Sequence, residues 1–361
     1  MNNLDQLFVR EYQKSPLREQ YEKLKQEKSL RRRDMADELQ VSEAELVDQQ
    51  CDVKSVRLNK AFAELIRQLP ALGYIMTLTR NDHAVHERKG CYDNVSITGP
   101  MGLVITEDRK IDLRIILNRW KHGFAVREET EKGPRYSLQF FDETGTAIQK
   151  VFLQADSDRE AYVTIVDRYR SEDQTTPLEF NAITDLPEYA NDEIVDVEQL
   201  TQEWLAMTDV HQFFNILKKH KVSREQAFRL VGGSNAQPLD VSCVEGLLTQ
   251  AAEREIPIMC FVGNRGNIQI HSGVVKNIKR MGPWLNVLDP EFNLHLMDSG
   301  VERAWLVRKP GDTGLVTSIE FYDAQSQLIA QFFGVRREGQ EENPQWRELA
   351  ESFLTAEQKV A

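Results

Sequence analysis

Hydrophobic and polar positions follow two different patterns along the first half of this 361-residue chain. Residues 16–70 place leucine and tyrosine at helical spacing among charged residues, and Ser42 stands before Glu43 as a helix cap would. From residue 73 to 153 the pattern changes to short apolar or alternating runs, which are typical of strands. The turn sequence 142–145 between two such runs predicts a hairpin. We therefore expect helices followed by an antiparallel meander, an α+β fold.

The second half repeats this order. We expect helices from about Val197 to Glu255, strands from Ile258 to Val335, and a terminal helix from Asn343 to Lys359. The polar and acidic stretch 171–196 contains two prolines and predicts a linker. These patterns predict an N-terminal domain at 1–175, a linker at 176–196 and a C-terminal domain at 197–361.

Short motifs recur between the halves at a fixed distance. Ile75 and Gly99 return as Ile258 and Gly282, and 258 − 75 = 282 − 99 = 183. After a two-residue deletion the offset becomes 181, so that Arg114 corresponds to His295 (295 − 114 = 181). Repeat arrays use units of roughly 20 to 50 residues, so this period indicates a duplicated domain. The interface between two related halves is a natural place for one ligand.

Charge and cysteine content exclude several classes of function. The formal net charge of −12 disfavours a nucleic-acid footprint or binding to an anionic membrane surface. Four widely spaced cysteines without a CxxC pair predict neither a disulfide framework nor a zinc site, which favours the reduced cytoplasm. We find no leader and no membrane span in the sequence, so we expect an unprocessed protein that is not embedded in a membrane.

Common enzymatic motifs such as Walker-type phosphate loops, GxGxxG and HExxH are absent from the sequence. Residues 263–267 resemble a phosphate loop, but no helix follows them, so a tight hairpin is expected. We expect one helix over 203–215, in which Trp204, Met207, His211 and Phe214 form an apolar stripe. His211 is then either a packed core residue or a ligand of a metal. The equivalent position in the first half is Leu30 (211 − 181 = 30), which has no polar side-chain atom.

Several segments of the chain carry a resemblance to a known family. In the second half they are 207–214, 261–266, 284–286, 294–296 and 308–310, and in the first half 80–81, 84–87, 112–114 and 140–142. In these motifs the chain resembles the bacterial cytoplasmic haem-utilisation family, the hemin-degrading or hemin transport proteins of the HemS/ChuS/HmuS type. The resemblance covers nearly the whole length, including the duplication.

The resemblance implies that two similar α+β halves hold one haem in a cleft between them. It places the proximal iron ligand at His211 and a distal, catalytic arginine at Arg114. It assigns the haem propionates to Arg224, Lys309, Gln331 and Arg336, adds Phe261 to the haem-binding residues, and offers His86 as a second haem-binding position. The family often has Gln-Leu-Tyr-Gly where this chain has residues 331–334 with Phe333, so we expect position 333 only to pack.

Elementary chemistry agrees with a haem ligand, because haem needs a neutral imidazole, an apolar slot and a few cations for its propionates. Two functions remain open. One is an enzyme that opens the porphyrin ring and releases iron, with electrons from an external donor. The other is a carrier that accepts imported haem and passes it on. The expected partners are haem, the haem importer and a reductase, with a homodimer as a candidate assembly.

Overall fold

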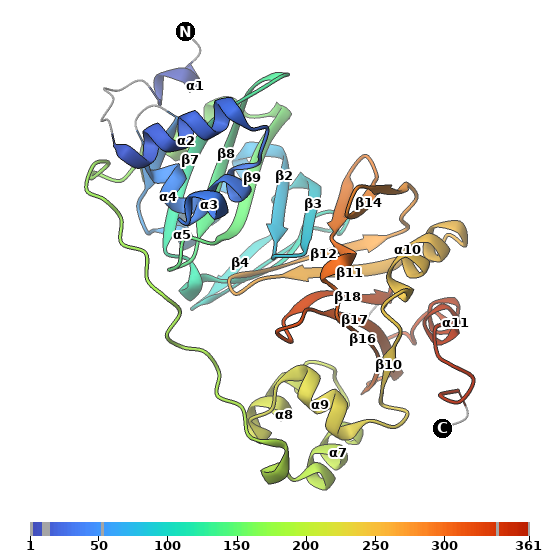
Figure 1. The fold of residues 1–361 in the computed structure, drawn as a ribbon. Coiled ribbons are helices and arrows are strands. Elements are labelled where there is room, and N and C mark those ends of the chain that lie inside the picture. Colours follow the sequence, from blue (N-terminus) through green and yellow to red (C-terminus); the bar gives the residue numbers. More distant parts are fainter. Residues whose placement is uncertain (1–2, 9–14, 52–53, 337–338, 360–361) are drawn as a thin grey trace. The chain divides into compact units, whose positions relative to one another are not determined.

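The chain forms two compact units, which we describe from a computed structural model (Figure 1). The structure describes residues 3–8, 15–51, 54–336 and 339–359. Within these ranges, unit 1 comprises the residues up to 80, residues 87–184 and residues 264–269. Unit 2 comprises residues 81–86, 185–263 and the residues from 270 onwards. Each unit therefore contains six residues from the opposite half of the sequence.

These two short segments are equivalent in the duplication, because 264 − 81 = 269 − 86 = 183. In unit 1, Gln269 accepts a hydrogen bond from the Thr79 hydroxyl at 2.8 Å, and the Asn267 amide donates to the same hydroxyl at 2.7 Å. In unit 2, the Asn81 amide donates to the Ile329 carbonyl at 2.8 Å. The units are thus not two independent stretches of sequence. The domain boundaries expected from the sequence remain a prediction.

Unit 1 combines helices with two antiparallel groups of strands. Its helices are α1 (Asn3–Gln6), α2 (Pro16–Glu27), α3 (Arg32–Leu39), α4 (Glu43–Asp48), α5 (Phe62–Ile66), η1 (Leu69–Leu72), η2 (Leu117–Arg119) and α6 (Arg159–Tyr169). Five strands pair in the order β1 (Ser55–Leu58), β7 (His122–Thr130), β8 (Gly133–Phe141), β9 (Ala147–Ser157) and β2 (Gly73–Arg80). A second group pairs β4 (Val95–Thr98), β5 (Met101–Ile105), β6 (Asp112–Ile116) and the first residues of β12 (Asn267–Gly273). β3 spans Ala84–Cys91.

Unit 2 repeats the same plan. Its helices are η3 (Asp192–Ile194), α7 (Val197–Leu205), α8 (Gln212–His220), α9 (Arg224–Val231), α10 (Cys243–Glu253), η4 (Asp298–Gly300) and α11 (Pro344–Ser352). Five strands pair in the order β10 (Ala236–Leu239), β16 (Arg303–Gly311), β17 (Gly314–Tyr322), β18 (Leu328–Gly334) and β11 (Ile258–Gly263). A second group pairs β13 (Ile278–Met281), β14 (Trp284–Leu288) and β15 (Phe292–Leu296). The predicted α+β duplication is confirmed.

Local sequence explains why corresponding elements form in both units. Ser42 and Ser223, which are 181 residues apart, each close a capping box with Glu45 and Gln226 at the starts of α4 and α9. The Asp142 carboxylate accepts the backbone N–H groups of residues 144 and 146, and Asp323 does the same for residues 325 and 327. The hairpin turn predicted at 142–145 is therefore confirmed, the equivalent turn follows Asp323 in unit 2, and an aspartate side chain holds each of them.

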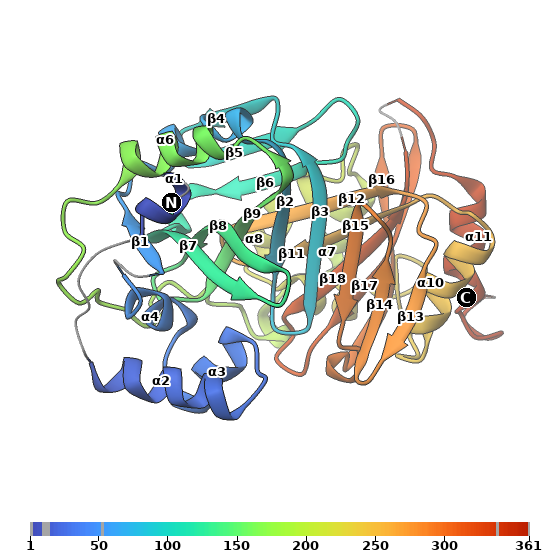
Figure 2. The ribbon, with the colours of Figure 1, turned by 90° about the horizontal axis from the view of Figure 1, so that it is seen from above.

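The helices of each unit pack on its five-stranded sheet. Figure 1 shows α2, α3 and α4 lying across the strands β7 to β9 in unit 1. In unit 2, Trp204, Phe213, Phe228 and Trp305 form a buried aromatic cluster under α7, α8 and α9. Helices α10 and α11 lie side by side in Figure 1 and in Figure 2. A Cβ atom on Gly334 would come within 2.7 Å of the Trp346 side chain, so this strand position requires glycine for the close approach of α11.

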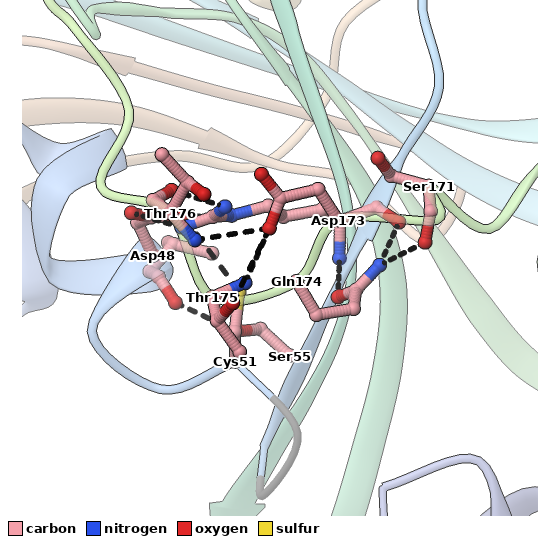
Figure 3. A network of polar contacts seen from close by, with 10 residues as sticks. Asp48, Cys51, Ser55, Ser171, Asp173, Gln174, Thr175 and Thr176 are labelled. Carbon is pink, nitrogen blue, oxygen red and sulfur yellow. Dashed lines mark hydrogen bonds and ion pairs between the residues drawn. The ribbon is translucent and has the colours of Figure 1, made fainter. Parts of the chain in front are cut away.

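The stretch predicted as a linker is partly fixed to unit 1. The Arg57 backbone N–H donates to Gln174 at 2.8 Å, and its guanidinium donates to the Thr176 carbonyl and to buried Asp48. Figure 3 shows Gln174 and Thr176 in this network beside Asp48. Phe180 then packs on the cluster around Phe124. Residues 182–189 follow, and they are exposed apart from half-buried Ile183. The exposed part of this stretch is therefore shorter than the polar composition predicts.

Two predictions about secondary structure are wrong in detail. Strands β1 and β10 lie inside stretches that we expected to be entirely helical, and each is the outer strand of its five-stranded group, paired with β7 and β16 respectively. A four-residue strand is too short to produce a clear alternating pattern, so only its partner strand identifies it. The terminal helix ends at Ser352 instead of Lys359.

Candidate functional site

His211 lies in the connection between two helices, not on the apolar stripe of one. Helix α7 ends at Leu205 and α8 begins at Gln212, so the expected helix over 203–215 is wrong. Trp204, Met207 and Phe213 are buried, whereas the His211 side chain is 88 % exposed and Phe214 is 71 % exposed. The break places Phe213 instead of Phe214 in the core. As a consequence, the imidazole faces solvent and can be reached by a ligand.

Hydrogen bonds fix this connection. The Gln212 side-chain oxygen accepts the backbone N–H groups of Thr208 at 2.9 Å and Asp209 at 3.3 Å. The Asp209 carboxylate accepts the His211 backbone N–H at 2.8 Å and contacts its ring Nδ1 at 2.7 Å. These bonds from His211, together with the charge of Arg336, lower the pKa of Asp209 below its usual value. The carboxylate therefore stays ionised and orients the imidazole.

A buried carboxylate joins two of the residues expected to bind propionates. Glu320 is fully buried and accepts the Arg224 Nε at 2.7 Å, the Arg224 Nη2 at 3.0 Å and the Lys309 Nζ at 3.0 Å. The Ser318 and Tyr322 hydroxyls donate to the same carboxylate. Two cations thus share one carboxylate. The excess positive charge can attract an anionic ligand.

The surroundings shift the pKa values in this group. Burial and the charge of Arg224, opposed by the carboxylate of Glu320, together lower the pKa of Lys309 to about 8. Burial raises the pKa of Glu320, but the charges of Arg224 and Lys309 outweigh burial and hold it well below the usual range. Both cations also lie over the Phe213 ring, at 5.2 Å for Arg224 and 4.8 Å for Lys309 from its centroid. Phe213 therefore connects these cations with the helix that follows His211.

The remaining candidates on the β18 side of unit 2 lie close to this group. Gln331 is paired in register with Glu320 on one neighbouring strand and with Phe261 on the other. Within the described part of the chain, its buried Nε2 has no hydrogen-bond partner. Phe261 packs on Phe333 with 5.1 Å between ring centroids. Arg336 makes an ion pair with Asp312 at 3.8 Å. Position 333 does pack against a neighbouring ring, as expected.

Arg114 belongs to unit 1 and lies on an open sheet face. Its side chain is 31 % exposed and forms an ion pair with Asp112, which is almost fully buried. In register, Leu103 and Ile268 flank it on the two neighbouring strands. Leu103 and Met101 on the same face are 40 % and 47 % exposed. Arg114 therefore lies among partly exposed apolar side chains, and its partner Asp112 also pairs with Arg109 at 3.3 Å.

The other two histidines considered have different surroundings. His86 is fully buried in unit 2, and its ring lies 4.9 Å from that of Phe292 between centroids. His271 stacks on the same Phe292 ring at 3.8 Å. His295 is half-buried, with its Nδ1 at 2.6 Å from the Asn286 side-chain oxygen. A role for His86 in haem binding remains a prediction.

Sequence reasoning missed Asp209, Glu320 and Phe213. The spacing Asp-x-His was a usable signal for Asp209, since an aspartate commonly accepts the backbone N–H two residues later. Polar residues 318, 320 and 322 alternate along one strand, and this regularity was a signal for a buried polar face. Phe213 had no signal, because only the break between α7 and α8 decides which phenylalanine is buried.

Two structural findings limit the kinds of site present. Within the described residues, histidine, cysteine and acidic side chains do not gather in groups of three that could hold a metal ion. None of the helices in the described ranges has the length and apolar character that crossing a membrane requires. All four cysteines lie in the described part of the chain, and none of them forms a disulfide there.

Comparisons with known proteins identify the family. Residues 40–169 and 221–353 each match the haemin-degrading HemS.ChuX domain, and the two matches start 221 − 40 = 181 residues apart. The hemin transport protein HemS of Yersinia enterocolitica is 39 % identical over 320 residues, which is 88 % of this chain and 90 % of the relative. The hemin transport protein HmuS of Yersinia pestis is 39 % identical over 318 residues, again 88 % and 90 % of the two chains.

Solved structures agree with these sequence matches. Holo-PhuS, a heme-binding protein from Pseudomonas aeruginosa, is 45 % identical, with a TM-score of 0.91 over 94 % of this chain and 99 % of that chain. ChuS, an E. coli heme oxygenase, is 36 % identical, with a TM-score of 0.84 over 94 % and 99 %. The domain matches in both halves and the relatives that match most of the length lead to one conclusion: the chain belongs to the haemin-degrading HemS.ChuX family of haem-utilisation proteins.

Proposed function

We propose that this protein binds haem through His211 and opens the porphyrin ring with electrons from an external donor, which releases iron for acquisition. The observation that carries the proposal is the exposed His211 ring with Nδ1 held by Asp209. This arrangement leaves Nε2 to coordinate iron. The family membership and the description of the similar ChuS as a heme oxygenase support the same function.

The side chains described above fit the chemistry of haem. Haem carries two carboxylates, and the excess charge of Arg224 and Lys309 around Glu320 would attract them. The Gln331 Nε2, which has no hydrogen-bond partner among the described residues, and the charge of Arg336 could add donors. Phe261 and the exposed Phe214 offer apolar contact to a porphyrin edge. Bound haem would supply the redox-active iron, while these residues bind and orient the macrocycle.

Arg114 has a different role in the proposal. It offers a permanently charged guanidinium among partly exposed apolar side chains, where negative charge that develops during the reaction would be stabilised more strongly than in water. We propose that this arginine acts on the open side of the iron and that both halves are needed for turnover. Asp112 holds the guanidinium in place by an ion pair.

A haem titration of wild-type protein and His211→Ala tests the proposed ligand. We expect one haem per wild-type chain, and a changed Soret band and weaker binding for His211→Ala. His220→Ala is the matched control, because it removes an imidazole from the other end of the same short helix. An unchanged Soret band and affinity in His211→Ala would overturn the assignment.

The reaction itself is tested with haem-loaded protein and a reductant, with and without oxygen. We expect loss of the Soret band, released iron and a tetrapyrrole product. Stable haem under all conditions would favour the second candidate, a carrier that passes haem on. The exposure of His211 favours this candidate, because ligand exchange needs access to the iron ligand. We propose the cytoplasm as location and the haem importer and a reductase as partners.

A further inference from the structure

One carboxylate oxygen of Asp209 contacts His211 twice. Oδ1 accepts the backbone N–H of His211 at 2.8 Å and lies 2.7 Å from the ring Nδ1. The backbone of Asp209 is itself fixed by the Gln212 side chain at 3.3 Å. The imidazole is thus held by a short network of hydrogen bonds within the five consecutive residues 208–212.

The contact determines which nitrogen of His211 carries the proton. An ionised carboxylate can only accept hydrogen bonds, so Nδ1 must be the donor. In the neutral ring the lone pair then lies on Nε2, the nitrogen at the other side of the imidazole. The ring is 88 % exposed and the Asp209 side chain 57 % exposed, so water competes for this hydrogen bond in the free protein. A macrocycle bound at Nε2 would shield the pair and strengthen it.

The equivalent residues of unit 1 lack both members of the pair. The 181-residue offset places Lys28 at the position of Asp209 (209 − 181 = 28) and Leu30 at the position of His211. Lys28 ends α2 and forms an ion pair with Glu38. Carboxylate and imidazole therefore occur together in one copy and are both absent from the other. This joint occurrence indicates that they act as a unit.

We propose that Asp209 is a positioning residue that draws the Nδ1 proton of His211 toward its carboxylate and makes Nε2 a stronger donor to haem iron. This inference rests on the proposed function. A more basic axial imidazole stabilises ferric over ferrous haem, since hydrogen bonds around an axial ligand tune the potential of the iron. Asp209 would thereby set how strong a reductant the bound haem requires.

Asp209→Asn is the test, because asparagine keeps the size and a backbone-accepting oxygen but removes the charge. We expect haem affinity to fall by about 10- to 100-fold. We also expect a lower iron–histidine stretching frequency in the ferrous complex and a more positive reduction potential. Asp240→Asn is the matched control, because Asp240 accepts the N–H of Ser242 two residues later at 2.9 Å, with no imidazole involved.

The outcomes separate this inference from the proposed function. If His211→Ala leaves the Soret band unchanged, His211 is not the ligand and the proposed function fails. If His211→Ala loses the band while Asp209→Asn keeps the wild-type stretching frequency and potential, the function stands and the inference is overturned. A lower affinity of Asp209→Asn without a change in either spectroscopic property would also overturn it, because that result describes a role in loop structure alone.

Discussion

The two units place buried charges at equivalent positions but pair them differently. In unit 1, Glu43 pairs with Lys150, and Arg32 pairs with Glu128 at 2.7 Å. In unit 2, Arg224 and Lys309 both pair with Glu320. The 181-residue offset relates these sets as follows: Glu43 to Arg224, Glu128 to Lys309, Gln139 to Glu320, and Lys150 to Gln331.

This difference explains how a duplicated fold can acquire one site. In unit 1, Lys150 and Arg32 pair with two different carboxylates, and the exposed Arg135 also pairs with Glu128, so the group serves to hold α3 and α4 on the sheet. In unit 2 two cations share one carboxylate, and the neighbouring Gln331 amide lacks a partner within the described residues. A buried charge without its own partner is costly, unless a ligand compensates it. The difference therefore predicts an anion site in unit 2 and none at the equivalent place in unit 1.

The largest expected effect is on stability and follows from Glu320→Gln. We expect the free energy of unfolding to fall by about 3 to 5 kcal/mol, because the buried Lys309 and the half-buried Arg224 would lose their common carboxylate. Urea unfolding followed by tryptophan fluorescence measures the change. Ser318→Ala is the control and should cost only about 1 kcal/mol, since it removes one neutral donor. A loss of stability in Glu320→Gln as small as that in Ser318→Ala would contradict the proposed difference between the units.

The same substitution in both units should give different results. Lys150→Met leaves the buried Glu43 carboxylate without its ion-pair partner, so we expect a loss of about 3 kcal/mol. Lys309→Met leaves Glu320 paired with Arg224, so we expect a loss of no more than about 1 kcal/mol. Haem titration of Lys309→Met should also show weaker binding. Equal destabilisation by both substitutions would mean that the two groups do not differ in charge balance.

The units should also differ in their response to acid. Burial lowers the pKa of His122 to about 4 from 6.5, and its ring lies 4.8 Å from that of Phe180. As the pH falls, the His122 ring therefore takes up a proton in the unfolded chain before it does so in the folded chain. The stability that is present above pH 6.5 is lost as the pH falls toward 4. The equivalent residue in unit 2 is Arg303, which keeps its charge and pairs with Glu225.

His122→Gln should remove part of this acid sensitivity. Unfolding curves of the variant and of wild-type protein between pH 7 and pH 4.5 measure the difference. We expect the free energies of unfolding of the two proteins to differ near neutral pH and to become more similar as the pH falls. If the free energies of unfolding of the two proteins changed in parallel over this pH range, His122 would have the same pKa in the folded and the unfolded chain, which would contradict the prediction.

The smallest expected effect is on haem affinity and concerns the equivalent residues Arg114 and His295. Arg114→Ala should change the affinity by less than about threefold, which is under about 1 kcal/mol. Turnover should slow by roughly 100-fold, because the cation acts on charge that develops during the reaction. Arg114→Lys should restore turnover only in part, since lysine lacks the planar fork. His295→Ala is the matched variant and should change neither quantity. Equal loss of haem binding in both Arg114 variants would place this residue among the propionate contacts.

The sequence by itself determined the α+β character, the duplication and the offset that relates the two copies. Local patterns are sufficient for these features, because capping serines, turn aspartates and apolar alternation act over a few residues. The motifs around His211 and Arg114 were also sufficient to indicate the family. In each case the signal lies in residues that are close together in the chain.

Only the tertiary structure decided which groups meet. The break between α7 and α8 depends on burying Phe213 in the core of unit 2, and this burial turns His211 toward solvent. Arg224 reaches Glu320 across 96 residues of sequence, because β17 brings the carboxylate under α9. The exchange of segments 81–86 and 264–269 between the units likewise depends on strand pairing. Contacts of this kind follow from packing over long sequence separations, which no local pattern records.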